Sequence, residues 1–183
     1  MTPSSPPWLD RLERWLAANR PEYLARLRPG APADTVTLLP PGLTALYRWR
    51  DGQANSGDSF LVRHWLMPLA QMQEQRKDTA KARDEDGYGA EWWSDDWFPF
   101  LDDGQGNLTC VDASSGRVLL YFFDSEERNE LAPSLDVFFT TLLDSLEAGH
   151  WRIDDEGRAL VADPDGFTAL LKSRGVCFDA YGY

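Results

Sequence analysis

Acidic and aromatic side chains are concentrated in the segment 84–103, and these residue types are typical of a protein-docking surface. The segment holds eight Asp or Glu residues and no Lys or Arg. Carboxylates can meet the basic rim of a partner protein, and tryptophan rings supply buried contact area. We therefore predict a partner-binding surface that consists of Glu91, Trp92, Trp93, Asp95, Asp96, Asp102 and Asp103. The alternative is a solvated loop whose tryptophans point into the core, as we expect of Trp97 and Phe100.

Nucleophilic catalysis needs a nucleophile beside a general base, and the only histidines are His64 and His150. Either could pair with Cys110 or a serine, but no nucleophile elbow or related local signature is present. His64 lies in a strand-like run, and His150 follows a helix stop, where it can interact with carbonyl groups. Paired carboxylates have no diagnostic value in so acidic a chain. We predict no catalytic residues and a protein that is not an enzyme.

The segment 102–107 combines acids with glycines, a composition also found in calcium loops. It lacks the alternating D-x-[DN]-x-[DN]-G pattern and the final Glu of an EF-hand. A turn that joins two strands, with Gly104 and Gly106 at positive φ, is the better interpretation. The segment 87–89 is no phosphate loop, because no Lys-Ser/Thr follows it and no strand precedes it.

The bulk composition describes an acidic globular protein. The chain has 183 residues and a formal net charge of -12, which disfavours nucleic acid as the main partner. Such a charge favours a basic protein partner, whose approach the field accelerates. Cys110 and Cys177 match no metal-ligand spacing or disulfide framework, so we expect no metal and no cofactor. With no apolar run of membrane-span length and no secretory signal, we expect no membrane partner and a cytoplasmic location.

Helical and strand patterns alternate along the chain. Helices are expected at 8–16, after Pro21, at 41–50, from 69 to about 83, at 134–149 and at 164–172. Gly52 fits the left-handed residue that commonly ends a helix. Strands are expected at 60–69, 97–101, 107–112, 116–123 and 158–161, with a hairpin turn at 113–116. This order predicts an α+β fold with a central, mostly antiparallel sheet flanked by helices.

Two of these segments carry a family resemblance. Leu39-Pro-Pro-Gly-Leu-Thr-Ala-Leu-Tyr-Arg-Trp-Arg-Asp-Gly52 and Trp97-Phe-Pro-Phe-Leu-Asp-Asp-Gly-Gln-Gly-Asn-Leu-Thr-Cys-Val-Asp112, in this order, resemble the SMI1/KNR4 family (the SUKH superfamily). Asp51 stands where that family usually has Asn, and Asp can play the same turn role. The length of the chain predicts a single domain over 1–183. Its SMI1/KNR4-like core would span 30–149, between an N-terminal helical extension at 1–29 and a C-terminal strand-helix extension at 150–183.

The resemblance also implies a function, because many bacterial members look like immunity proteins against secreted toxins. We expect a non-enzymatic protein that binds a cognate toxin encoded nearby and occludes its active site. The acidic charge favours a basic toxin, such as a nuclease or a nucleotide-targeting enzyme. Trp92 and Trp93 would be the anchors, and the carboxylates would occupy the space of substrate phosphates.

Two other interpretations stay open. Eukaryotic relatives look like regulatory scaffolds with several partners, although such hubs often carry long disordered arms that this chain almost lacks. An enzyme would require a cleft that gathers His64 or Cys110 with acids.

Overall fold

The centre of the fold is a five-stranded antiparallel sheet. The computed structural model describes residues 5–54, 60, 64–123, 128–153 and 159–177. The sheet order is β3-β4-β5-β6-β7, formed by Trp65–Leu66, Trp97–Asp102, Leu108–Asp112, Val118–Tyr121 and Arg128–Ala132. Two antiparallel pairs lie outside it: β1 (Leu27–Pro29) with β2 (Arg50–Gln53), and β8 (Trp151–Ile153) with β9 (Ala159–Val161). The predicted α+β fold is therefore confirmed.

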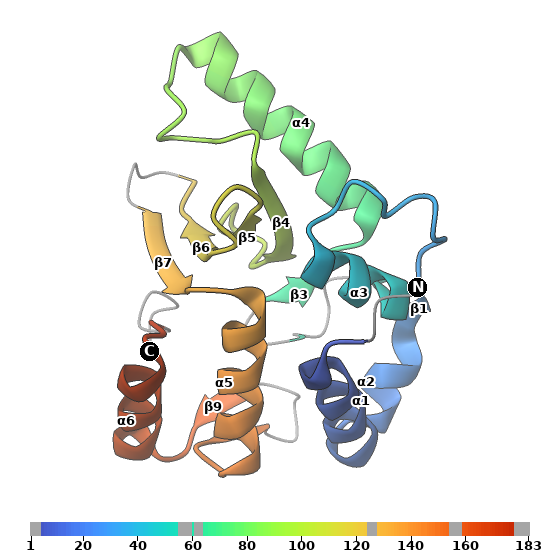
Figure 1. Ribbon diagram of the computed structural model, residues 1–183, viewed down its shortest axis with the longest axis vertical. Helices are drawn as coiled ribbons and strands as arrows, with labels where there is room; N and C mark the ends of the chain where they lie inside the picture. Colours follow the sequence, from blue (N-terminus) through green and yellow to red (C-terminus); the bar gives the residue numbers. More distant parts are fainter. Residues whose placement is uncertain (1–4, 55–59, 61–63, 124–127, 154–158, 178–183) are drawn as a thin grey trace.

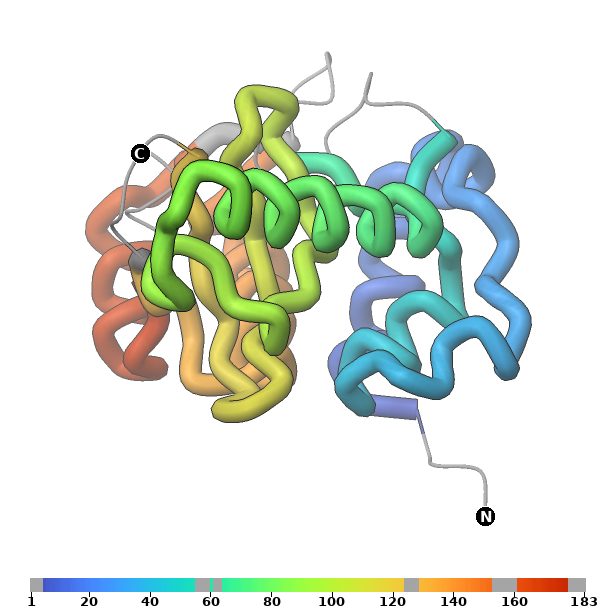
Figure 2. The backbone as a smooth tube through the Cα atoms, turned by 90° about the horizontal axis from the view of Figure 1, so that it is seen from above, coloured from blue at the N-terminus to red at the C-terminus, as the bar shows by residue number. Residues whose placement is uncertain are grey.

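Six helices are present in the described part of the chain. They are α1 (Pro7–Asn19), α2 (Pro21–Arg26), α3 (Pro41–Trp49), α4 (Leu69–Asp86), α5 (Leu135–Glu147) and α6 (Pro164–Arg174). In Figure 1, α4 and α5 lie on opposite sides of the sheet, and α1, α2 and α3 form a group beside it. Figure 2 shows that α4 spans the distance between this N-terminal helical group and the sheet.

The two faces of the sheet are covered by different means. On one face, the amphipathic helix α5 places Phe138 and Phe139 about the ring of Phe100, with ring centroids 6.0 and 6.2 Å away. On the other face, α4 buries few side chains, namely Leu69, Met72 and Thr79. A helix without a continuous apolar stripe cannot cover a sheet by itself. A second apolar cluster fills this side, formed by Met67, Trp92, Trp93, Trp97, Leu108, Cys110 and Tyr121.

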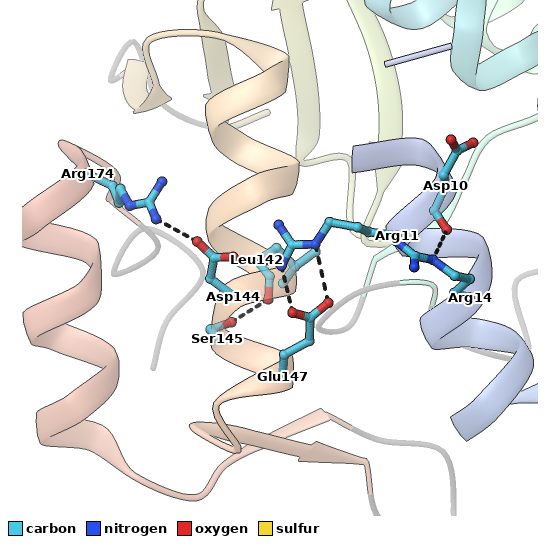
Figure 3. Close-up of polar contacts among 8 residues, drawn as sticks. All are labelled: Asp10, Arg11, Arg14, Leu142, Asp144, Ser145, Glu147 and Arg174. Carbon is cyan, nitrogen blue, oxygen red and sulfur yellow. Dashed lines mark hydrogen bonds and ion pairs between the residues drawn. The ribbon is translucent and has the colours of Figure 1, made fainter. Parts of the chain in front are cut away.

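The first helix, α1, and the last helix, α6, both pack on α5. Trp8 of α1 stacks on Phe139 with ring centroids 4.3 Å apart. Figure 3 shows the polar side of this contact, where Arg11 Nη2 lies 2.7 Å from both Asp144 Oδ1 and Glu147 Oε2. Arg174 of α6 reaches the other oxygen of Asp144 at 2.7 Å. Hydrogen bonds to Glu147 and Asp144 raise the pKa of Arg11. One carboxylate thus connects the first and last helices.

The end of α3 differs from the sequence prediction. The helix ends at Trp49, because Arg50 is extended, with φ -147° and ψ 132°, and starts β2. Gly52 does adopt positive φ, at 71°, but it lies inside β2. A Cβ there would lie 2.5 Å from the carbonyl carbon of Met67, so the glycine permits close backbone approach. Asp51 accepts a hydrogen bond of 2.7 Å from the amide of Leu69, the first residue of α4.

The strand prediction was correct for the middle of the sheet and incomplete at its edges. The turn at 113–116 joins β5 to β6, with Gly116 at φ 77°. Of the strand expected at 60–69, the structure has only the two residues of β3, and positions 61–63 lie outside the described residues. No strand was expected from the sequence at the position of β7, so this edge strand was missed.

Candidate functional site

The predicted partner-binding surface begins where α4 ends. Gly87 ends the helix in the left-handed conformation, at φ 73°. Residues 87–96, called the return loop here, then lead back to the first residue of β4 (Figure 1). The exposed carboxylates of this loop and the last turn of α4 form the acidic face, which we define as Asp84, Glu85, Asp86, Glu91, Asp95 and Asp96.

Two arginines of α4 hold the return loop in place. Arg83 donates from Nη1 to the carbonyl oxygen of Trp93 at 3.0 Å and to Asp95 Oδ1 at 3.2 Å. Arg76 donates to the carbonyl oxygens of Asp95 and Trp97, the latter at 3.0 Å, and lies over the ring of Phe98. Burial lowers the pKa of Arg76, which the nearby carboxylates of Asp95 and Asp96 partly offset. Sequence reasoning missed both residues, because neither lies in the acidic segment.

Trp92 and Trp93 are core residues of the second apolar cluster. Their exposed fractions are 9% and 0%, so Trp93 offers no surface to a partner in this conformation. Both rings pack edge-on against Tyr121, at 5.6 and 5.2 Å between centroids, and Trp93 also packs edge-on against Trp97. The core needs them because α4 supplies little apolar surface there. The structure therefore places the predicted anchors inside the molecule.

Tyr88 takes the exposed aromatic position of the return loop. Its ring stacks on Trp92 with centroids 4.8 Å apart, and 47% of the residue remains exposed. A ring that is half supported and half exposed suits an interface contact, because little side-chain entropy is left to lose on binding. Sequence reasoning passed over Tyr88, which sits between two glycines and has no periodic pattern to indicate its direction.

Asp102 and Asp103 stabilise the turn between β4 and β5. Asp102 Oδ1 accepts from the amide of Gly104 at 2.6 Å, and Asp103 Oδ1 accepts from the amide of Gln105 at 2.8 Å. Gly104 and Gly106 have φ values of 77° and 94°, as expected for a strand-joining turn. Burial raises the pKa of Asp102, with a further increase from Asp103, although the Gly104 amide opposes the change.

The predicted surface is therefore divided between the two ends of β4. Glu91, Asp95 and Asp96 precede Trp97, the first residue of the strand, whereas Asp102 is its last residue. The six residues of β4 separate the two groups by about 17–20 Å. Near the first group lies Asp112, which pairs with Trp97 in the sheet.

The carboxylate of Asp112 is held by its own turn. It accepts hydrogen bonds from the hydroxyls of Ser114 and Ser115, each at 2.7 Å. Burial would raise its pKa, but the serine hydroxyls and amides outweigh burial and lower it. Asp112 therefore remains an anion beside the acidic face.

The side chains considered for catalysis are either buried in the core or held by a structural contact. His64 and Cys110 are buried, with exposed fractions of 5% and 0%. His150 Nδ1 lies 2.9 Å from Asp163 Oδ2, and Asp163 also caps α6 through the amide of Gly166. Within the described residues, no cluster of three His, Cys, Asp or Glu side chains could hold a metal ion. None of the described helices is long and apolar enough to cross a membrane.

Comparison with known proteins identifies the family. None of the curated proteins compared with the sequence matches it. The model of the SMI1 / KNR4 family (SUKH-1) matches residues 36–141, which include α3, α4 and the whole five-stranded sheet. The matched region covers more than half of the chain and contains the return loop with its acidic face. This chain belongs to the SMI1/KNR4 family (SUKH-1).

Proposed function

We propose that this protein is a cytoplasmic immunity protein that binds and neutralises one cognate bacterial toxin. Membership of the SUKH-1 family is consistent with this type of protein and with a non-enzymatic role. The observation that carries the proposal is the acidic face, in which the exposed carboxylates of Glu91, Asp95 and Asp96 stand on a loop fixed by Arg76 and Arg83. A charged surface that is already ordered loses little entropy on binding.

The charge of this face defines the toxin that it fits. Glu91 and Asp96 are exposed and form no ion pair with the described residues, so their charge is available to a partner. Asp95 is 74% exposed but shares its charge with Arg83. Such a surface complements a basic active-site rim, as in an enzyme that acts on nucleic acid or nucleotides. The carboxylates would take the positions of substrate phosphates and exclude the substrate.

Aromatic contact would come from Tyr88 instead of the two buried tryptophans. Tyr88 lies on the same return loop as Glu91 and presents a ring already supported by Trp92. Tyrosine is among the residues that contribute most to binding at protein interfaces. The proposed contact therefore combines one partly exposed ring with the surrounding carboxylates.

The test is a toxicity rescue with a matched charge control. The C-terminal toxin domain encoded by the adjacent upstream gene is expressed alone, with the wild-type protein, and with the E91K/D96K variant. We expect the toxin to stop growth and the wild type to restore it through a stable complex. E91K/D96K should slow association about 10-fold or more at low salt, because steering charges act mainly on the association rate.

The E22K/D165K variant is the control, since it makes the same change of net charge at exposed positions on α2 and α6. It should associate at nearly the wild-type rate, and the remaining difference reports the effect of net charge alone. Unrelieved killing without a complex would contradict the immunity function. Equal rates for both variants would show that toxin binds elsewhere.

A further inference from the structure

The C-terminal extension reaches the outer edge of the central sheet. β7 is the last strand in the sheet order and pairs with β6 along one side. Along its other side, the amide of Cys177 donates to the carbonyl oxygen of Leu131 at 2.9 Å. A residue that follows α6 therefore bonds to the backbone of an edge strand far away in the sequence.

The edge at β7 is the one that needs a cover. An edge strand presents backbone N–H and C=O groups to any second strand, which makes it a site of pairing between molecules. The opposite edge, β3, consists of only two residues, and a very short strand offers little to pair with. β7 has five residues, and its last two, Leu131 and Ala132, are fully buried. Residues 176–177 contribute to the cover on this edge.

The end of α6 directs these two residues toward β7. Gly175 follows the helix in the left-handed conformation, at φ 63°. Its amide donates to the carbonyl oxygen of Lys172 at 3.4 Å, and the amide of Val176 donates to that of Leu171 at 3.1 Å. These two hydrogen bonds define a Schellman motif, in which the positions of Leu171 and Val176 commonly carry apolar residues in contact. Both side chains are buried in the main core.

α6 is itself fixed to the rest of the molecule. Phe167 packs edge-on against Trp151 of β8, with ring centroids 5.0 Å apart. Arg174 Nη2 lies 2.7 Å from Asp144 Oδ2 of α5. Residues 176–177 therefore hold their place through the packing of α6 as well as through the hydrogen bond to β7.

The sequence of β7 is complementary to itself. Antiparallel pairing with a second copy, centred on Asn129, would place the Arg128 position opposite Glu130. Opposite charges across a strand pair are favourable. Glu130 lies 2.9 Å from Arg117 within the molecule, but its side chain is 42% exposed and can meet a second cation. The charges of the partner strand are known here, because the partner is the same strand.

We propose that the C-terminal extension keeps the protein monomeric by occupying the outer edge of β7. Val176 and Cys177 must leave this edge before β7 of a second copy can pair with it. The inference does not rest on the proposed function, since both partners are this chain. It gives a role to residues that lie outside the family match at 36–141.

The test displaces the cover in the whole 183-residue chain. Val176→Asp puts a charge at a buried position, and Ser173→Asp puts the same charge at an exposed position of α6 as the matched control. In sedimentation velocity under reducing conditions, V176D should dimerise at concentrations at least about 10-fold lower than the wild type or S173D. V176D/N129K should be monomeric again, because like charges then face each other at the centre of the strand pair. Circular dichroism establishes that each variant is folded.

A second pair of variants leaves the core intact. Proline has no amide hydrogen, so Cys177→Pro loses the hydrogen bond to Leu131, whereas Cys177→Ser keeps it. We expect faster amide hydrogen exchange in β7 and self-association for C177P and not for C177S. A folded V176D protein that stays monomeric, or a dimer that N129K does not dissociate, would overturn the inference. If V176D does not fold, identical behaviour of C177P and C177S would overturn it.

Discussion

Arg83 is joined to Asp95 across the base of the return loop, with Nη1 3.2 Å from Oδ1 of the carboxylate. The same nitrogen also holds the carbonyl oxygen of Trp93 at 3.0 Å. An acidic surface would otherwise repel itself, and the guanidinium supplies the opposite charge from behind the loop. The acidic face is therefore part of a mixed network whose cations come from α4.

This arrangement predicts the effect of Arg83→Gln. We expect faster amide hydrogen exchange over residues 88–96 and slower association with toxin, since the loop must then be ordered during binding. Global stability should change little, because the ion pair lies at the surface. Lys81→Gln is the matched control, since among the described residues Lys81 pairs only with Glu85, at 3.6 Å, on the same helix. Equal exchange in the two variants would show that Arg83 does not fix the loop.

Substitution of Trp93 should mainly reduce stability, whereas substitution of Tyr88 should mainly weaken binding. Trp93 is fully buried, and truncation to Ala should lower the free energy of unfolding by about 3–5 kcal/mol. Tyr88→Ala removes a ring that is 47% exposed and should cost far less stability while weakening toxin binding. Urea unfolding and calorimetric titration of both variants measure the two quantities. Wild-type affinity in Y88A would remove Tyr88 from the proposed contact.

The difference between these two aromatics also shows what the sequence could predict. The helix 134–149 and the strands about the 113–116 turn carry local signals, such as Ser134, whose hydroxyl accepts from the amide of Val137. The return loop has no period, so nothing in it distinguishes inward rings from outward ones. The direction of Trp92 and Trp93 follows from the missing apolar stripe of α4, which is a property of packing partners far along the chain.

Arg50 and β7 show that local sequence signals also fail to predict parts of the backbone conformation. The helical pattern of α3 continues to Arg50 in the sequence. Arg50 nevertheless has an extended conformation, because it belongs to β2, which pairs with β1. β7 begins with three consecutive polar residues, Arg128, Asn129 and Glu130, so it lacks the alternation of a half-buried strand, and it is recognised only by its pairing with β6. Tertiary hydrogen bonds override local preference in both places.

The contributions of Asp102 and Asp112 to folding stability should depend on pH with opposite sign. Burial raises the pKa of Asp102 above 3.8 in the folded state, so folding favours its protonated form. Wild type should therefore lose stability relative to D102N as pH rises above 3.8 through the folded pKa, and the difference should be constant at higher pH. In D102N the amide oxygen can still accept from Gly104.

At Asp112 the pKa shift has the opposite sign, because hydrogen bonds from its turn outweigh burial and lower the folded pKa below 3.8. Its stabilising effect is present above 3.8 and disappears as pH falls through the folded pKa. D112N should therefore approach wild-type stability only at low pH. Urea unfolding of the two variants and wild type between about pH 3 and 7 measures both differences. Parallel curves for D102N and D112N would contradict this assignment.

Asp144 should be the most sensitive position of the network in Figure 3, because it connects α1 and α6 through one carboxylate. Its side chain is 24% exposed, so its ion pairs are only partly screened. We expect D144N to lower the free energy of unfolding by about 1 kcal/mol. E147Q removes the other carboxylate that pairs with Arg11, and because Glu147 is more exposed than Asp144, E147Q should lower the free energy of unfolding less. Combining D144N with R11Q should cost less than the sum of the single changes, since both remove the same pair. Additive costs in urea unfolding would show that Arg11 and Asp144 act independently.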